Sequence, residues 1–146
     1  MSRSGYSDDC DGPALAMWRG AVASAIRGKR GQAFLAELLA ALDALPKKRL
    51  GAHALRTEDG DFCAIGAVGA ARGMDLAAID PEDREAVAAA FGIAPAMAAE
   101  IMFENDDDFH YWQRQSPQAR WLHVRTWVVA SMTPNVADER QATVPR

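Results

Sequence analysis

Proline and glycine residues divide this chain into stretches whose length and apolar spacing fit helices and little else. Pro13, Pro95 and Pro117 stand where a first helical turn is expected, and proline suits that turn because its backbone N–H has no partner there. Gly28 and Gly92 stand where helices are expected to end. Between these residues, apolar side chains recur every three or four positions, which places them on one helical face. The sequence therefore predicts a mostly α-helical fold.

We expect about six helices packed in one compact domain. A chain of 146 residues has the usual size of a single domain. Residues 12–132 are expected to form this domain, with a flexible tail at 1–11 and another at 133–146. A tiny β-hairpin is expected around 50–62, where a turn-forming stretch interrupts the helical spacing. The expected helices cover about 13–27, 29–45, 62–72, 81–91, 95–104 and 117–132, and the short link between the first two predicts that they pack antiparallel. The expected N-caps of the third, fourth and sixth of these helices are Asp61, Asp80 and Ser116.

The charge balance narrows the function classes. The chain carries 16 basic and 20 acidic residues, a net charge of −4, which argues against a general nucleic-acid binder. The short clusters of lysine and arginine at 27–30 and 47–49 are interpreted as solvated charges in loops. Two cysteines, Cys10 and Cys63, do not make a disulfide framework, so a reducing compartment is expected. The sequence begins without an apolar signal-peptide run, and its apolar stretches fall short of the roughly 20 residues that span a membrane.

Cys63 is the one candidate nucleophile at an informative position. It stands at the start of the helix expected over 62–72, where the helix N-terminus can lower a thiol pKa. His53 or His110 could act as its base and Asn105 or Asp106 could orient that base, and the alternative catalytic set is Cys63, His110 and Asp106. The other interpretation is a small buried side chain, which free cysteine usually is. The apolar neighbours of Cys63 favour burial.

Gly66 and Gly69 lie three residues apart within the same expected helix. Glycine inside a helix costs up to about 1 kcal/mol relative to alanine, so close packing is the expected compensation. The surrounding sequence, GAVGAARG, matches neither a dinucleotide-binding nor a phosphate-binding loop. We therefore expect this helix at the centre of the domain, with another backbone against its glycines.

An acidic and aromatic stretch follows the fifth expected helix. Its carboxylates and His110 are of the right type for a divalent cation, but the spacing of a calcium-binding loop is missing, so no metal and no cofactor are expected. Aromatic residues beside the acids suit a protein interface, although they can instead close the core. The sequence predicts an exposed binding surface for a protein partner, made of Glu104, Asp106, Asp107, Asp108, Phe109, Tyr111 and Trp112.

The start of the helix expected over 62–72 and the Asn105-Asp106 pair carry a resemblance to known sequences. The chain resembles a loose group of small uncharacterised phage and prophage proteins, in which a G-x-x-C-[AC]-[LI]-G-[AV] segment precedes an Asn-Asp loop and a short last helix. The matching positions are Gly60, Cys63, Ala64, Ile65, Gly66, Asn105 and Asp106. The chain departs from that group in its longer insertion after Asp106. The resemblance implies a phage origin and carries no chemistry.

Together these features predict a phage-derived protein-interaction module rather than an enzyme. It would modulate a host or phage protein, for example in a defence system, through the acidic and aromatic surface, in the cytoplasm of the bacterial host. One alternative is a cysteine-dependent or metal-assisted enzyme centred on Cys63. A second alternative is a nucleic-acid-binding accessory protein.

Overall fold

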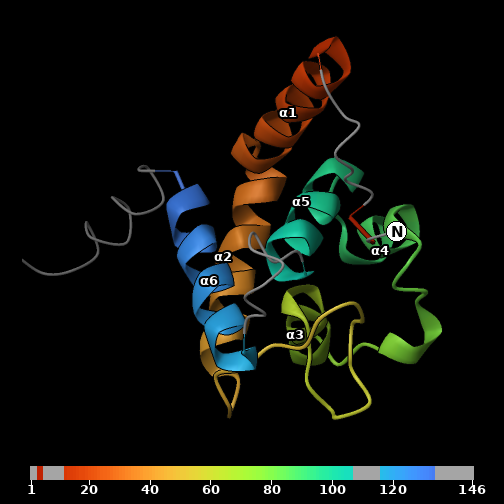
Figure 1. Cartoon of the computed structure of the whole chain (residues 1–146), viewed down its shortest axis with the longest axis vertical. Helices are drawn as coiled ribbons and strands as arrows, with labels where there is room; N and C mark the ends of the chain where they lie inside the picture. Colours follow the sequence, from red (N-terminus) through yellow and green to blue (C-terminus); the bar gives the residue numbers. More distant parts are fainter. Residues whose placement is uncertain (1–2, 5–11, 107–115, 134–146) are drawn as a thin grey trace, which may run out of the picture.

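The expected mostly α-helical fold is confirmed. The computed structural model describes residues 3–4, 12–106 and 116–133, and in residues 12–14 only the backbone. Within these residues lie six α-helices and one 3₁₀ helix, η1 (Figure 1). Their bounds are α1 Gly12–Arg27, α2 Lys29–Ala44, α3 Ala64–Ala71, η1 Leu76–Ala78, α4 Arg84–Phe91, α5 Pro95–Asp106 and α6 Pro117–Ser131.

The first two helices do not pack antiparallel, so that prediction was wrong. In Figure 1, α2 continues downward from the lower end of α1, and α6 lies beside α2. Gly28 alone separates α1 from α2, in an extended conformation, and a helical hairpin needs about two to five loop residues to reverse the chain. The junction is tight, because a Cβ at Gly31 would stand 2.0 Å from the carbonyl oxygen of Ala25.

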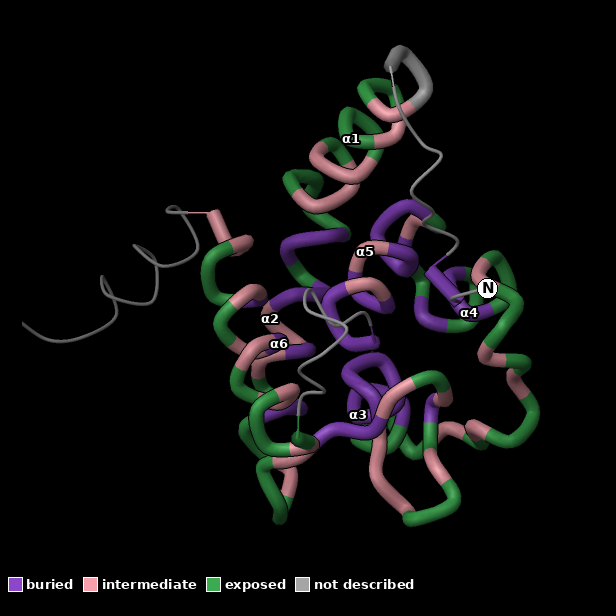
Figure 2. The backbone as a smooth tube through the Cα atoms, viewed as in Figure 1, coloured by how far each residue is buried: buried purple, intermediate pink, exposed green. Residues whose placement is uncertain are grey.

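The core forms around α3, as expected. All six residues from Ala64 to Gly69 are buried, whereas residues 15–27 of α1 are intermediate or exposed (Figure 2). A Cβ at Gly66 would stand 1.9 Å from the carbonyl oxygen of Leu55, and one at Gly69 would stand 2.5 Å from Cδ2 of Leu76. Both glycines therefore serve close packing. The other large core side chains include Phe34, Leu35, Leu38, Leu42, Phe91, Met97, Ile101, Met102, Val124 and Val128.

The chain before α3 is extended, so α3 begins two residues later than expected. The backbone N–H of Gly51 donates to the carbonyl of Phe62 at 2.9 Å, and that of Cys63 donates to the carbonyl of Leu55 at 3.1 Å. One antiparallel bridge joins Arg56 to Phe62. In the described residues, this bridge stands in place of the expected hairpin, since no named strand forms.

The ends of the later helices follow the expected capping chemistry in part. Ser116 caps α6 and Gly92 ends α4 in the left-handed conformation, as expected. Asp83 caps α4 in place of the expected Asp80, whose carboxylate instead accepts from the backbone N–H of Glu82 at 2.9 Å. Helix α5 extends to Asp106, two residues beyond the expected end.

Candidate functional site: a buried polar cluster and a surface groove

Asn105, near the end of α5, joins three parts of the chain. Its side chain is buried, with the residue 1% exposed. Oδ1 accepts from the backbone N–H of Ala64 at 2.9 Å, which satisfies the N-terminal turn of α3. Nδ2 donates to the carbonyl of Gly51 at 2.9 Å and to Oδ1 of Asp106 at 2.7 Å. Asn105 therefore fixes α3 and the 51–55 segment to the end of α5.

Asp106 is buried as half of an ion pair, so its expected place on an exposed acidic surface was wrong. The Arg3 guanidinium contacts both of its carboxylate oxygens, through Nε to Oδ2 and through Nη2 to Oδ1 at 2.8 Å. Burial raises the pKa of Asp106, but Arg3, the backbone N–H of His53 and the amide of Asn105 together hold it below the ordinary value. Arg3 and Ser4 are themselves buried, although both lie in the expected tail.

Arg3, Asn105 and Asp106 form a buried polar cluster, and His53 contacts this cluster through its backbone. Its N–H donates to Oδ1 of Asp106 at 3.0 Å, in a left-handed conformation with φ 68°. The imidazole is 68% exposed, and its Nδ1 lies 3.8 Å from Oδ2 of Asp106. Because the carboxylate is already held by Arg3, the imidazole stands at the edge of the cluster rather than inside it.

Cys63 also lies in this cluster. It forms the N-cap of α3, a position at which we expected Asp61. Its Sγ accepts from the backbone N–H of Gly66 at 3.3 Å, and the residue is 1% exposed. Cys63 is close enough to Arg3 to raise the pKa of that guanidinium, against the lowering effect of burial. The structure thus brings together two members of the alternative catalytic set, Cys63 and Asp106, with both buried. The third, His110, lies outside the described residues.

Glu104 is likewise buried within α5 and not in an exposed loop. Its Oε2 lies 2.7 Å from Nε2 of His123 on α6. Burial raises the pKa of Glu104, as does the charge of Glu100, and His123 only partly offsets this rise. The remaining members of the expected acidic and aromatic surface lie outside the described residues: Asp107, Asp108, Phe109, Tyr111 and Trp112. Across the described part of the chain, no three His, Cys, Asp or Glu side chains group as metal ligands.

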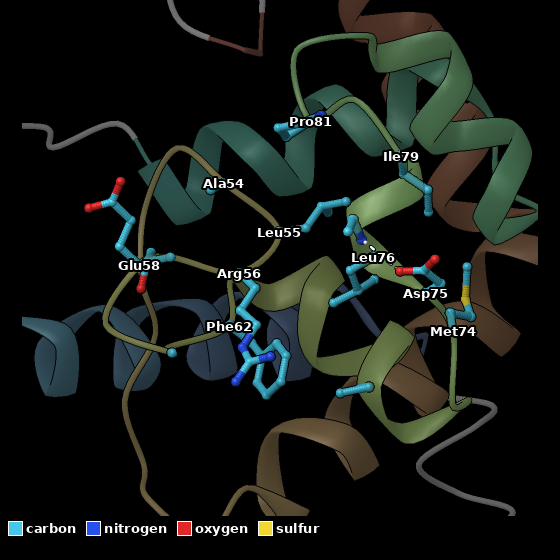
Figure 3. Close-up of a pocket in the computed structure, with 14 residues that line it drawn as sticks. Ala54, Leu55, Arg56, Glu58, Phe62, Met74, Asp75, Leu76, Ile79 and Pro81 are labelled. Atoms are coloured by element: carbon cyan, nitrogen blue, oxygen red, sulfur yellow. Dashed lines mark hydrogen bonds between the residues drawn. The ribbon is translucent and has the colours of Figure 1, made fainter.

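A surface groove lies between two segments, 54–62 and 70–81, and has a volume of about 680 Å³. Figure 3 shows labelled side chains from both segments facing this space, among them Phe62 and Leu76. We call it the groove and define it by its lining residues: Ala54, Leu55, Arg56, Thr57, Glu58, Gly60, Phe62, Ala70, Met74, Asp75, Leu76, Ala77, Ile79 and Pro81.

The groove combines an apolar floor with charged edges. Phe62, Met74, Leu76 and Ile79 pack against the core but stay partly exposed. The Arg56 guanidinium lies 5.6 Å from the centre of the Phe62 ring, a cation–π contact. Sequence reasoning missed this site because its segments lack helical periodicity. The available signal was a short run, 74–79, in which one or two small or acidic residues separate Met74, Leu76 and Ile79 outside any expected helix.

No protein-family model, curated protein or solved structure matches the chain. In the described part of the chain, no single helix is long and apolar enough to cross a membrane. The pair α4 and α5 reaches the necessary length and apolarity only when the two helices are taken together, and they meet at a bend of 107°. Function is therefore inferred from the geometry of the groove and of the buried cluster.

Proposed function

We propose that this chain is a protein-interaction domain and that the groove is where its partner binds. The observation that carries the proposal is the set of large apolar side chains on the floor of the groove, which stay partly exposed beside a complete core. Apolar surface gathered in a concavity with polar edges is typical of interaction sites. An anchor side chain of the partner would gain most by burying this floor.

The chemistry of the groove favours binding over catalysis. Among its lining residues, Thr57 has the one hydroxyl, and none is a histidine or a cysteine. The Thr57 Oγ1 accepts from the backbone N–H of Asp61 at 3.2 Å, which makes it part of the turn. In the buried cluster, the Asp106 carboxylate is held by Arg3 and Asn105, and the thiol of Cys63 is covered. The cysteine-dependent alternative needs a nucleophile and a base that a substrate can reach.

The nature of the partner follows from the sequence resemblance. Because the chain resembles phage and prophage proteins, we propose a host or phage protein as the partner, met in the bacterial cytoplasm. The expected binding residues in 107–112 lie outside the described residues, so the proposal rests on the groove.

Site-specific crosslinking tests the proposal. A photoreactive phenylalanine replaces Ala77, an exposed residue that lines the groove, or Ala89, an exposed residue of α4 outside it. Each full-length variant is irradiated in cells that express the chain natively. We expect one abundant adduct from position 77 that is missing from position 89. Equal adducts from both positions, or none from position 77, would contradict the proposal.

A further inference from the structure

The two segments that form the groove carry much of the net negative charge of the chain. Residues 54–62 and 70–81 contain five acidic and two basic residues, a net charge of −3, and Glu82 and Asp83, which directly follow the second segment, bring it to −5, whereas the whole chain has −4. One of the two basic residues, Arg72, is paired with Glu37 on α2, at 2.7 Å from Nε to Oε2. The other, Arg56, lies over the Phe62 ring. The negative charge of the chain is therefore concentrated around the groove.

The acidic residues around the groove fall into two groups, those that hold local structure and those that do not. Three of them hold local structure: Asp75 accepts from the N–H of Ala77 at 3.2 Å, and Asp80 and Asp83 accept from the N–H groups of Glu82 and Ala86. Asp61 is paired with Arg49 at 3.0 Å. Of the acidic residues around the groove, Glu58, Asp59 and Glu82 are exposed and cap no turn or helix in the described structure.

From this arrangement we propose that the groove receives a basic segment of the partner protein, with an apolar side chain that anchors on the floor and lysines or arginines that meet the acidic edges. This inference rests on the proposed function and names the chemistry of the partner. Opposite charge at the edges speeds association and selects partners, while the apolar floor supplies affinity.

The spread of the charge favours a peptide segment over a small cation. A pocket for a small molecule places a few polar groups so that they converge on one point. Here Glu58 and Asp59 lie in the 57–60 turn, whereas Asp75 lines the other segment and Glu82 directly follows that segment. An extended chain can reach both edges at once, with its anchor on the floor between them.

The experiment selects partners from a displayed library of random 12-residue peptides on the full-length protein. Groove dependence is judged with Ala70→Trp, which fills the groove, against the matched control Ala71→Trp. Both alanines are exposed on α3, and only Ala70 lines the groove. Peptides that lose at least tenfold in affinity with Ala70→Trp, and keep it with Ala71→Trp, are groove-dependent.

We expect the groove-dependent peptides to carry an apolar residue beside two or more lysines or arginines. Their affinity should fall about 5- to 10-fold when Glu58, Asp59 and Glu82 are replaced by their amides, and it should fall again in 1 M salt. Groove-dependent peptides that are neutral or acidic, or insensitive to salt, would overturn the basic-segment inference and leave the proposed function standing. Absence of any groove-dependent peptide would overturn both. Competition by a free polyamine as strong as by peptide would also overturn the inference.

Discussion

Replacing Asn105 with alanine should lower the stability of the fold, because this side chain connects α3 and the 51–55 segment to the end of α5. The substitution leaves the backbone N–H of Ala64 and the carbonyl of Gly51 buried without their present partner. An unsatisfied buried group costs about 1–3 kcal/mol, so we expect a loss of about 2–5 kcal/mol in the free energy of unfolding. For a domain of this size, that loss lowers the melting temperature by roughly 8–18 °C.

Urea unfolding followed by circular dichroism measures this effect. The control is Gln118→Ala, which removes an amide from an exposed position of α6 and should change stability by less than about 0.5 kcal/mol. A loss below about 1 kcal/mol for Asn105→Ala would mean that Asn105 does not satisfy those two buried groups.

Three further predictions concern buried residues. Gly66→Ala should cost at least about 3 kcal/mol in urea unfolding, since its Cβ would stand 1.9 Å from the carbonyl oxygen of Leu55. Burial raises the pKa of Glu104, so its contribution to stability is full below the unfolded pKa of about 4.3 and is lost as pH rises through the folded value. Glu104→Gln should therefore be more stable than the wild type at pH 8, with the gain gone at pH 3. In a Cys10→Ser background, Cys63 should react with iodoacetamide about 100-fold more slowly in the native protein than in urea, because the thiol is buried.

Each of these predictions has an outcome that contradicts it. A stable Gly66→Ala variant would mean that α3 does not approach the 51–55 segment so closely. A gain for Glu104→Gln that is equal at both pH values would exclude ionisation as its cause. Rapid alkylation of native Cys63 would show an accessible thiol and would favour the cysteine-dependent enzyme over an interaction domain.

The sequence predicted the helices well where capping chemistry is local. Ser116 before Pro117, and Gly92 after α4, each act within one turn of the residue concerned. The choice between Asp80 and Asp83 could not be made in this way, because both are aspartates within two residues of Pro81 and either can cap. The direction of α2 after α1 depends on packing around Gly31, which no local pattern reveals.

The candidate site was less predictable, for a physical reason. Asp106 looks exposed in the sequence because it opens an acidic run, yet its partner Arg3 lies 103 residues away. Glu104 likewise meets His123 on another helix. Burial of a carboxylate depends on such distant partners. The groove also forms from two separate segments, so its shape follows from the packing of η1 and the 54–62 loop against α3.

The most direct test of the central claim is the yield of the crosslink from position 77, measured by mass spectrometry in the wild-type background, with Ala70→Trp and with Ala71→Trp. We expect the partner adduct to fall at least tenfold with Ala70→Trp, because a tryptophan side chain fills the groove, and to stay within twofold with Ala71→Trp. An adduct that survives Ala70→Trp unchanged would contradict the groove as the site of partner binding.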